Sequence, residues 1–232
     1  MSIAENVAAV RERLAAAARR AGRNPDEIVL MGVSKTFPAE SICEAYFAGI
    51  RMFGENRVQE FGGKFELLRN LRDAEWHLIG HLQSNKASKA AEFFHAVDSV
   101  DSLRLAERLD SATAAVGKKL KILIEINIGG EAAKSGLAPN SSDLEQLLKA
   151  APRLKHLQIR GLMTIPPFAE NPEGSRPYFR KLRELRDELR VRKLPGVVLD
   201  VLSMGMSHDF EVAVEEGSTC VRVGTGVFGV RK

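Results

Sequence analysis

The stretch Val29-Leu30-Met31-Gly32-Val33-Ser34-Lys35 is a short apolar run that ends in a serine and a lysine. Its length and composition predict a buried strand over residues 28–34. A lysine at the end of such a strand turns outward into solvent, pairs its amine with a carboxylate, or is held in a partly dry pocket as a Schiff-base nucleophile. The outward orientation is the commonest of the three, so the rest of the chain must decide between them.

The same pattern of a strand followed by a helix recurs along the chain. Apolar runs with strand character fall at residues 28–34, 50–53, 76–79, 93–97, 120–128, 157–165, 197–202 and 220–223. Helical spacing of apolar residues follows the strands, and one extra helix over residues 2–21 precedes the first. Regular alternation predicts a parallel sheet with right-handed crossovers. Eight repeats in 232 residues favour a single (β/α)8 TIM-barrel domain spanning residues 1–232.

An open doubly wound sheet shares this alternation and remains an alternative. No GxGxxG motif follows the first strand, which argues against a dinucleotide-binding fold of that kind. No linker or shift in composition divides the chain.

Composition excludes several classes of protein. The net charge of +4 is too small to argue for nucleic acid, and no apolar run has the length of a membrane span. The two cysteines, Cys43 and Cys220, and the histidines have no metal-binding spacing. With few cysteines and no apolar signal core, we expect a reduced protein of the cytoplasm.

Polar residues gather where the predicted strands end, which in a barrel is the rim that carries the chemistry. Two of these ends, residues 203–207 and 224–226, have the small and hydroxyl residues of a phosphate cradle. They follow the seventh and eighth strands, where barrels commonly bind phosphate. Each is also consistent with an ordinary turn.

Arg222 lies inside the last predicted strand, between Val221 and Val223. If it faces the barrel interior, its guanidinium needs an acceptor, because an unpaired buried charge is very costly. A structural salt bridge to a neighbouring carboxylate would also satisfy it. The charged helix over residues 175–193 predicts a solvated face with ion pairs along the helix rather than an RNA-binding surface.

Six motifs together resemble the YggS/PROSC family of pyridoxal phosphate homeostasis proteins, which is similar to the barrel domain of bacterial alanine racemase. The motifs are VSKTFP, FGENRVQE, WHLIGHLQSNK, INIGGEAAKSGL, RGLMTIP and SMGMSHDFEVAVEEGSTCVRVGTGVFG. They run from about residue 28 almost to the C-terminus.

The resemblance implies a role for particular residues toward pyridoxal 5'-phosphate. Lys35 would carry the cofactor as an internal aldimine, and Arg222 would meet the pyridine nitrogen and keep it unprotonated. The remaining implied contacts are Ser203, Gly224 and Thr225 to the phosphate, and Asn56 and Met204 near the ring. Lys134 matches a second family lysine near the entrance, with a transfer or regulatory role.

The chain departs from alanine racemase in ways that bear on catalysis. It ends at Lys232, so we expect no C-terminal β-domain to supply the second catalytic base and the dimer contacts. The two tyrosines, Tyr46 and Tyr178, fall in predicted helices rather than at strand ends. We therefore expect a monomeric carrier of pyridoxal 5'-phosphate, without catalytic residues, that meets pyridoxal phosphate-dependent apo-enzymes transiently. A racemase-like enzyme and a Schiff-base aldolase acting on a phosphosugar remain alternatives.

Overall fold

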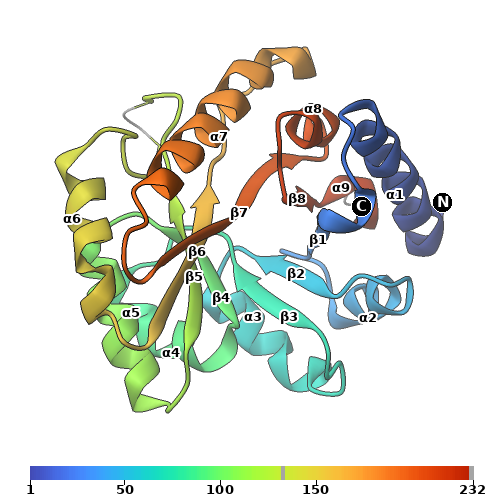
Figure 1. The fold of residues 1–232 in the computed structure, drawn as a ribbon. Coiled ribbons are helices and arrows are strands. Elements are labelled where there is room, and N and C mark those ends of the chain that lie inside the picture. The colour runs from blue at the N-terminus through green and yellow to red at the C-terminus, as the bar shows by residue number, and fades with distance from the viewer. Residues whose placement is uncertain (132–133, 230–232) are drawn as a thin grey trace.

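The computed structural model describes residues 1–131 and 134–229, and over these ranges the chain forms a closed barrel of parallel strands (Figure 1). Strand order around the barrel follows chain order, and β8 closes against β1. The strands are β1 (Val29–Val33), β2 (Met52–Glu55), β3 (Glu75–Leu78), β4 (Ala96–Val100), β5 (Leu120–Glu125), β6 (Leu157–Met163), β7 (Val197–Met206) and β8 (Cys220–Val223). The predicted (β/α)8 barrel is confirmed, and an open sheet is excluded because all eight pairings are made.

Helices cover the outside of the barrel. They are α1 (Ile3–Arg20), α2 (Ala39–Phe47), α3 (Val58–Phe65), α4 (Ala87–Phe93), α5 (Leu103–Ala115), α6 (Ser142–Ala150), α7 (Arg176–Val191), α8 (Phe210–Glu215) and α9 (Thr225–Phe228). The predicted extra helix is α1, which begins with a capping box between Ser2 and Glu5. It buries Val7, Val10 and Leu14 and lies beside α8 and α9 (Figure 1). None of these helices is long and apolar enough to cross a membrane.

The end of β7 differs from the prediction. The strand continues to Met206 instead of stopping near residue 202, because Met206 pairs with Arg222 of β8 across an irregular register. The helix that follows begins at Phe210 instead of Ser207, since a turn held by the bond from the Met206 N–H to Asp209 Oδ1 (2.8 Å) comes first. Residues 203–207 therefore belong to a strand end and a turn.

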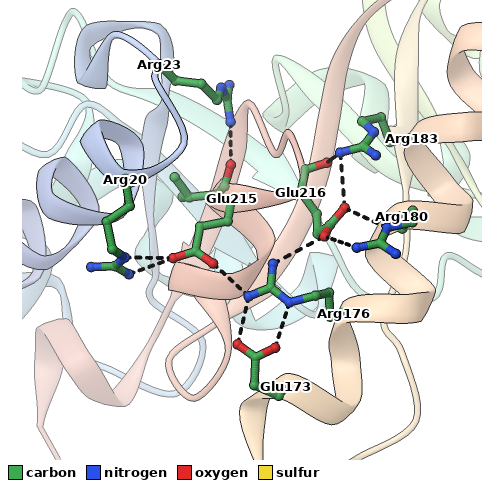
Figure 2. Close-up of polar contacts among 9 residues, drawn as sticks. Arg20, Arg23, Glu173, Arg176, Arg180, Arg183, Glu215 and Glu216 are labelled. Carbon is green, nitrogen blue, oxygen red and sulfur yellow. Dashed lines mark hydrogen bonds and ion pairs between the residues drawn. The ribbon is translucent and has the colours of Figure 1, made fainter.

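A network of arginines and glutamates ties α8 to the elements on both sides of it (Figure 2). Glu216 is 4% exposed and accepts ion pairs from three arginines of α7, namely Arg176, Arg180 and Arg183. Glu215 pairs with Arg20 of α1 and with Arg176. Most charged side chains of α7 are exposed and Arg186 pairs with Asp187 on the same helix, as predicted, but these three arginines also pair with another element. The network fixes α8 directly after the turn at the end of β7.

Candidate functional site

A cavity of about 570 Å³ opens at the carboxyl ends of the strands. Five of the residues singled out from the sequence line it: Lys35, Asn56, Arg222, Gly224 and Thr225. These residues are up to 190 positions apart and come from the ends of β1, β2 and β8. Its volume falls within the range of small-molecule sites. The barrel thus brings most of the predicted site together in one place.

Lys35 lies in a tight turn that follows β1. The N–H of Phe37 donates to the carbonyl of Ser34 at 3.1 Å, which places Lys35 and Thr36 at the two central positions of the turn. Lys35 is half-buried and is one of the residues that line the cavity, which favours the pocket over the fully solvated alternative. Thr36 has a φ of 64°, a left-handed conformation that is rare for a β-branched residue.

Arg222 is 3% exposed and faces the cavity from the middle of the rim. Its guanidinium donates to Ser203 Oγ and to the carbonyl of Thr164, both at 2.8 Å. Among the described residues no carboxylate lies within 4.0 Å of it, so the structural salt bridge considered above is not formed there. Burial lowers its pKa below the usual value, but an arginine remains cationic. A buried guanidinium without a carboxylate partner still has N–H groups with which to donate to an acceptor on a ligand.

Ser203 and Met204 do not line the cavity. Both are fully buried within β7, where the Ser203 hydroxyl accepts the bond from Arg222. Ser203 therefore contacts the guanidinium of Arg222 without lining the cavity itself. Met204 belongs to the hydrophobic core.

Ser207 is a site residue that the sequence-based selection missed. Its Oγ accepts hydrogen bonds from the N–H groups of Gly224 (3.2 Å) and Gly226 (3.4 Å), and it lines the cavity with Gly224 and Thr225. Both amide N–H groups are taken up by the Ser207 oxygen, so within this cluster the Ser207 hydroxyl hydrogen is left as a donor for a ligand. The composition of the stretch 203–207 predicts a phosphate cradle, but only the structure identifies which of its two serines lines the cavity.

Glu125 is the second missed residue. It ends β5, is 8% exposed and lines the cavity that Arg222 also faces. Burial raises the pKa of its carboxyl to about 7, assisted by nearby Asp101 and opposed by Arg222. A carboxyl that titrates near neutrality can take up or release a proton in the cavity. A carboxylate at the end of an apolar strand was the available sequence signal.

Lys134 also lines the cavity, at its outer part. Its Nζ donates to the carbonyl of Pro166 at 3.2 Å and pairs with Glu131. Ile165 and Phe168 extend this part of the wall and are exposed. Lys134 is therefore held at the cavity wall by two contacts, beside exposed apolar side chains.

Among the residues that the structure describes, neither a second cavity nor a metal-binding cluster offers an alternative site. A cavity of about 550 Å³ near the start of β1 and β2 is lined by none of the predicted site residues. Within residues 1–131 and 134–229 no group of three or more histidine, cysteine, aspartate or glutamate side chains could hold a metal ion. The cavity at the carboxyl rim is the candidate site.

The fold and this site define a class of protein, a parallel barrel with a lysine, an arginine and a group of glycine and hydroxyl residues at its carboxyl rim. The family model described as "Alanine racemase, N-terminal domain" matches residues 6–232. Curated proteins named "Pyridoxal phosphate homeostasis protein" match along the whole chain. The relative from Aquifex aeolicus is 48% identical over 100% of both chains, and that from Pseudomonas aeruginosa is 45% identical over 99% of this chain and 96% of its own.

The chain therefore belongs to the pyridoxal phosphate homeostasis protein family, whose barrel is of the alanine racemase N-terminal-domain type. Among solved structures, PipY from Synechococcus elongatus PCC7942, with pyridoxal phosphate (PLP) bound, is 41% identical, and the match has a TM-score of 0.85. It covers 98% of this chain and 100% of PipY.

Proposed function

We propose that this chain binds pyridoxal 5'-phosphate in the rim cavity and holds it as an imine of Lys35. The observation that carries the proposal is that Lys35, Arg222 and the Ser207–Gly224 cradle line one cavity. The PLP-bound structure of PipY supports the choice of cofactor. An aldehyde, a basic ring nitrogen and a phosphate on one small ring require these three kinds of partner.

The residues present fit the cofactor, each through its own chemistry. Lys35 would hold the cofactor through its amine, because the aldehyde of the cofactor would supply the group with which a primary amine condenses reversibly, with release of water. Arg222 would donate an N–H to the ring nitrogen and, being cationic, would disfavour protonation of that nitrogen. An unprotonated ring is a weak electron sink, which disfavours chemistry on an amino acid. Ser207, Gly224 and Thr225 bind the phosphate.

We further propose that the chain stores and delivers the cofactor instead of using it catalytically. Neither tyrosine lines the cavity, and the Tyr46 hydroxyl instead donates to Asp73 on the outside of the barrel. In this proposal the Lys134 amine, which also lines the cavity, binds the aldehyde of the cofactor while the cofactor is being released. In this proposal the protein is a monomer, and the recipients are apo-enzymes that need pyridoxal phosphate.

Borohydride reduction tests the binding mode. Treatment of the yellow complex should bleach it and leave the cofactor covalently attached to Lys35, located by peptide mass. The Lys35→Ala variant should show no such attachment, whereas Lys89→Met, a change at an exposed lysine of α4, should behave like the unchanged protein. An unaltered imine spectrum in Lys35→Ala would overturn the assignment.

Glu125 favours one second candidate, a weak enzyme acting on amino acids. Its pKa of about 7 and its place in the cavity suit it to move a proton to or from a bound amino acid. Exchange of the α-proton of single amino acids in deuterated water, measured with the loaded protein and with free cofactor, separates the two functions. Exchange far faster than with free cofactor, and lost in Glu125→Gln, would favour the enzyme over the carrier.

A further inference from the structure

The turn that carries Lys35 is held in place from outside the cavity by a second lysine. Lys64, on the last turn of α3, extends its Nζ to the carbonyls of Ser34 and Phe37, both at 3.2 Å. These two carbonyls belong to the first and last residues of the turn. A single ammonium therefore joins both ends of the segment that contains Lys35.

The ammonium is itself fixed by a buried carboxylate. Glu55, at the end of β2, is fully buried, and its Oε1 accepts a bond from Lys64 Nζ at 2.8 Å and one from the Ser34 hydroxyl at 2.7 Å. The Lys64 side chain is only 13% exposed in this pair. Charge-assisted bonds in such surroundings are stronger than neutral ones. The start of the turn is thus attached to β2 and α3 through side chains as well as through β1.

The turn needs such support because its backbone is strained. Thr36 has a φ of 64°, in a region that favours glycine and that costs a β-branched residue free energy. Its N–H donates to Glu60 Oε1, so α3 holds the turn at a third point, one helical turn before Lys64. Phe37 completes the contacts by stacking on Phe228 of α9 at 4.7 Å between ring centroids.

We propose that Lys64 is a positioning residue for Lys35, which keeps the strained turn in the conformation that presents the Lys35 amine to the cavity. Lys64 does not line the cavity and so makes no contact with the ligand. The inference rests on the proposed imine at Lys35 and adds a distinct claim. Imine formation depends on the turn, whereas binding of the ring and phosphate does not.

Two ligands separate these properties. Pyridoxal 5'-phosphate reports imine formation through its absorbance change, and pyridoxine 5'-phosphate, which has a hydroxymethyl group in place of the aldehyde, reports noncovalent binding alone. Because Lys64→Met would leave Glu55 buried without its partner, the variant of choice is the double change Glu55→Gln/Lys64→Met. The glutamine keeps an acceptor for Ser34. Glu60→Ala removes the third attachment without altering a buried pair, and Lys89→Met is the matched exposed control.

We expect the double variant to form the imine about tenfold more slowly, the effect of losing charge-assisted bonds to the turn, while its affinity for pyridoxine 5'-phosphate changes less than about twofold. Glu60→Ala should show a smaller change in the same direction, and Lys89→Met none. Adding Thr36→Gly to the double variant should restore part of the rate, because glycine adopts the left-handed conformation without strain.

Three results would contradict the inference. Imine formation at the unchanged rate in both the double variant and Glu60→Ala would remove the positioning role and leave the proposed function intact. If the rate of imine formation and the affinity for pyridoxine 5'-phosphate fell by the same factor, and Thr36→Gly recovered neither, Lys64 would support the fold only. Absence of an imine in the unchanged protein would overturn the proposed function and this inference with it.

Discussion

The hydroxyl oxygen of Ser207 lies 3.2 Å from the backbone nitrogen of Gly224, whose N–H it accepts. This bond joins the turn after β7 to the end of β8 at the wall of the cavity, where we propose that phosphate binds. Ser203, four residues earlier, instead accepts from Arg222 at 2.8 Å and lies behind the cavity wall. The two serines therefore have different hydrogen-bond partners, and their effects can be separated experimentally.

Ser207→Ala should weaken binding of pyridoxine 5'-phosphate by about tenfold, because one hydrogen bond to a charged group is lost. Ser203→Ala should leave unchanged the difference in binding free energy between pyridoxine and pyridoxine 5'-phosphate, which is the contribution of the phosphate group. Calorimetric titration with pyridoxine and with its phosphate isolates that contribution. If Ser203→Ala weakened the phosphate contribution and Ser207→Ala did not, the structural assignment of the cradle would be wrong.

The carboxyl of Glu125 should make the stability of the ligand-free protein depend on pH. Burial raises its pKa from 4.5 to about 7, so the folded state binds more protons than the unfolded state between these values. The free energy of unfolding should therefore decrease as pH rises through this window, by up to about 3 kcal/mol from this group. Urea unfolding at several pH values should show this decrease in the unchanged protein and a flatter profile in Glu125→Gln. Identical profiles would mean that Glu125 is ionised throughout.

Glu216 should contribute more to the free energy of unfolding than Glu173, an exposed glutamate of the same network (Figure 2). Glu216→Gln removes a nearly buried carboxylate that pairs with three arginines, so we expect a loss of about 1–3 kcal/mol in the free energy of unfolding. The matched change Glu173→Gln affects a side chain that is 57% exposed and should cost less than about 1 kcal/mol. Urea unfolding measures both. If both variants lost the same free energy of unfolding, the buried pairs of Glu216 would contribute no more to stability than the exposed pair of Glu173.

Gly80 allows the backbone of Asn56 to approach the rim. A Cβ at position 80 would lie 2.3 Å from the Asn56 carbonyl oxygen, so Gly80→Ala must displace that backbone. We expect a loss of about 1–3 kcal/mol in the free energy of unfolding, together with weaker ligand binding. Gly63 in α3 has nothing within 4 Å of such a Cβ, and Gly63→Ala should instead stabilise the protein by about 0.5–1 kcal/mol. Thermal unfolding compares the pair directly, and a tolerated alanine at Gly80 would mean that Asn56 can move freely.

Much of the barrel follows from local patterns. The apolar run from Val29 to Val33 and the alternation after it identify strands and helices, because burial on a strand or a helix face imposes its own spacing on the sequence. Strand boundaries were less accurate. The structure ends β5 at Glu125 instead of residue 128 and extends β7 to Met206, since ladder pairing with neighbouring strands decides where a strand stops.

Part of the site could be predicted in the same way, because the carboxyl ends of parallel strands share one rim. Lys35 and Gly224 were singled out by their position at strand ends and Arg222 by its charge inside a strand, and all three line the cavity, whereas the motifs of the family supplied the cofactor. Glu125 was missed since its raised pKa arises from burial and from Asp101, which lies 24 positions earlier in the chain. Likewise, the contact of Lys64 with the turn around Lys35 depends on how α3 packs, and no local pattern encodes it.

The sequence by itself determined that this chain alternates strand and helix, that Lys35 follows the first strand, and that glycines and hydroxyl residues follow the last two. Only the tertiary structure decided which serine enters the cradle. The register between β7 and β8 shifts between residues 203 and 206, and Gly205 has a φ of 92°. Side chains four positions apart on a regular strand share one face, so alternation alone predicts the same surroundings for Ser203 and Ser207. The irregularity breaks this alternation, and Ser203 contacts Arg222 whereas Ser207 contacts Gly224.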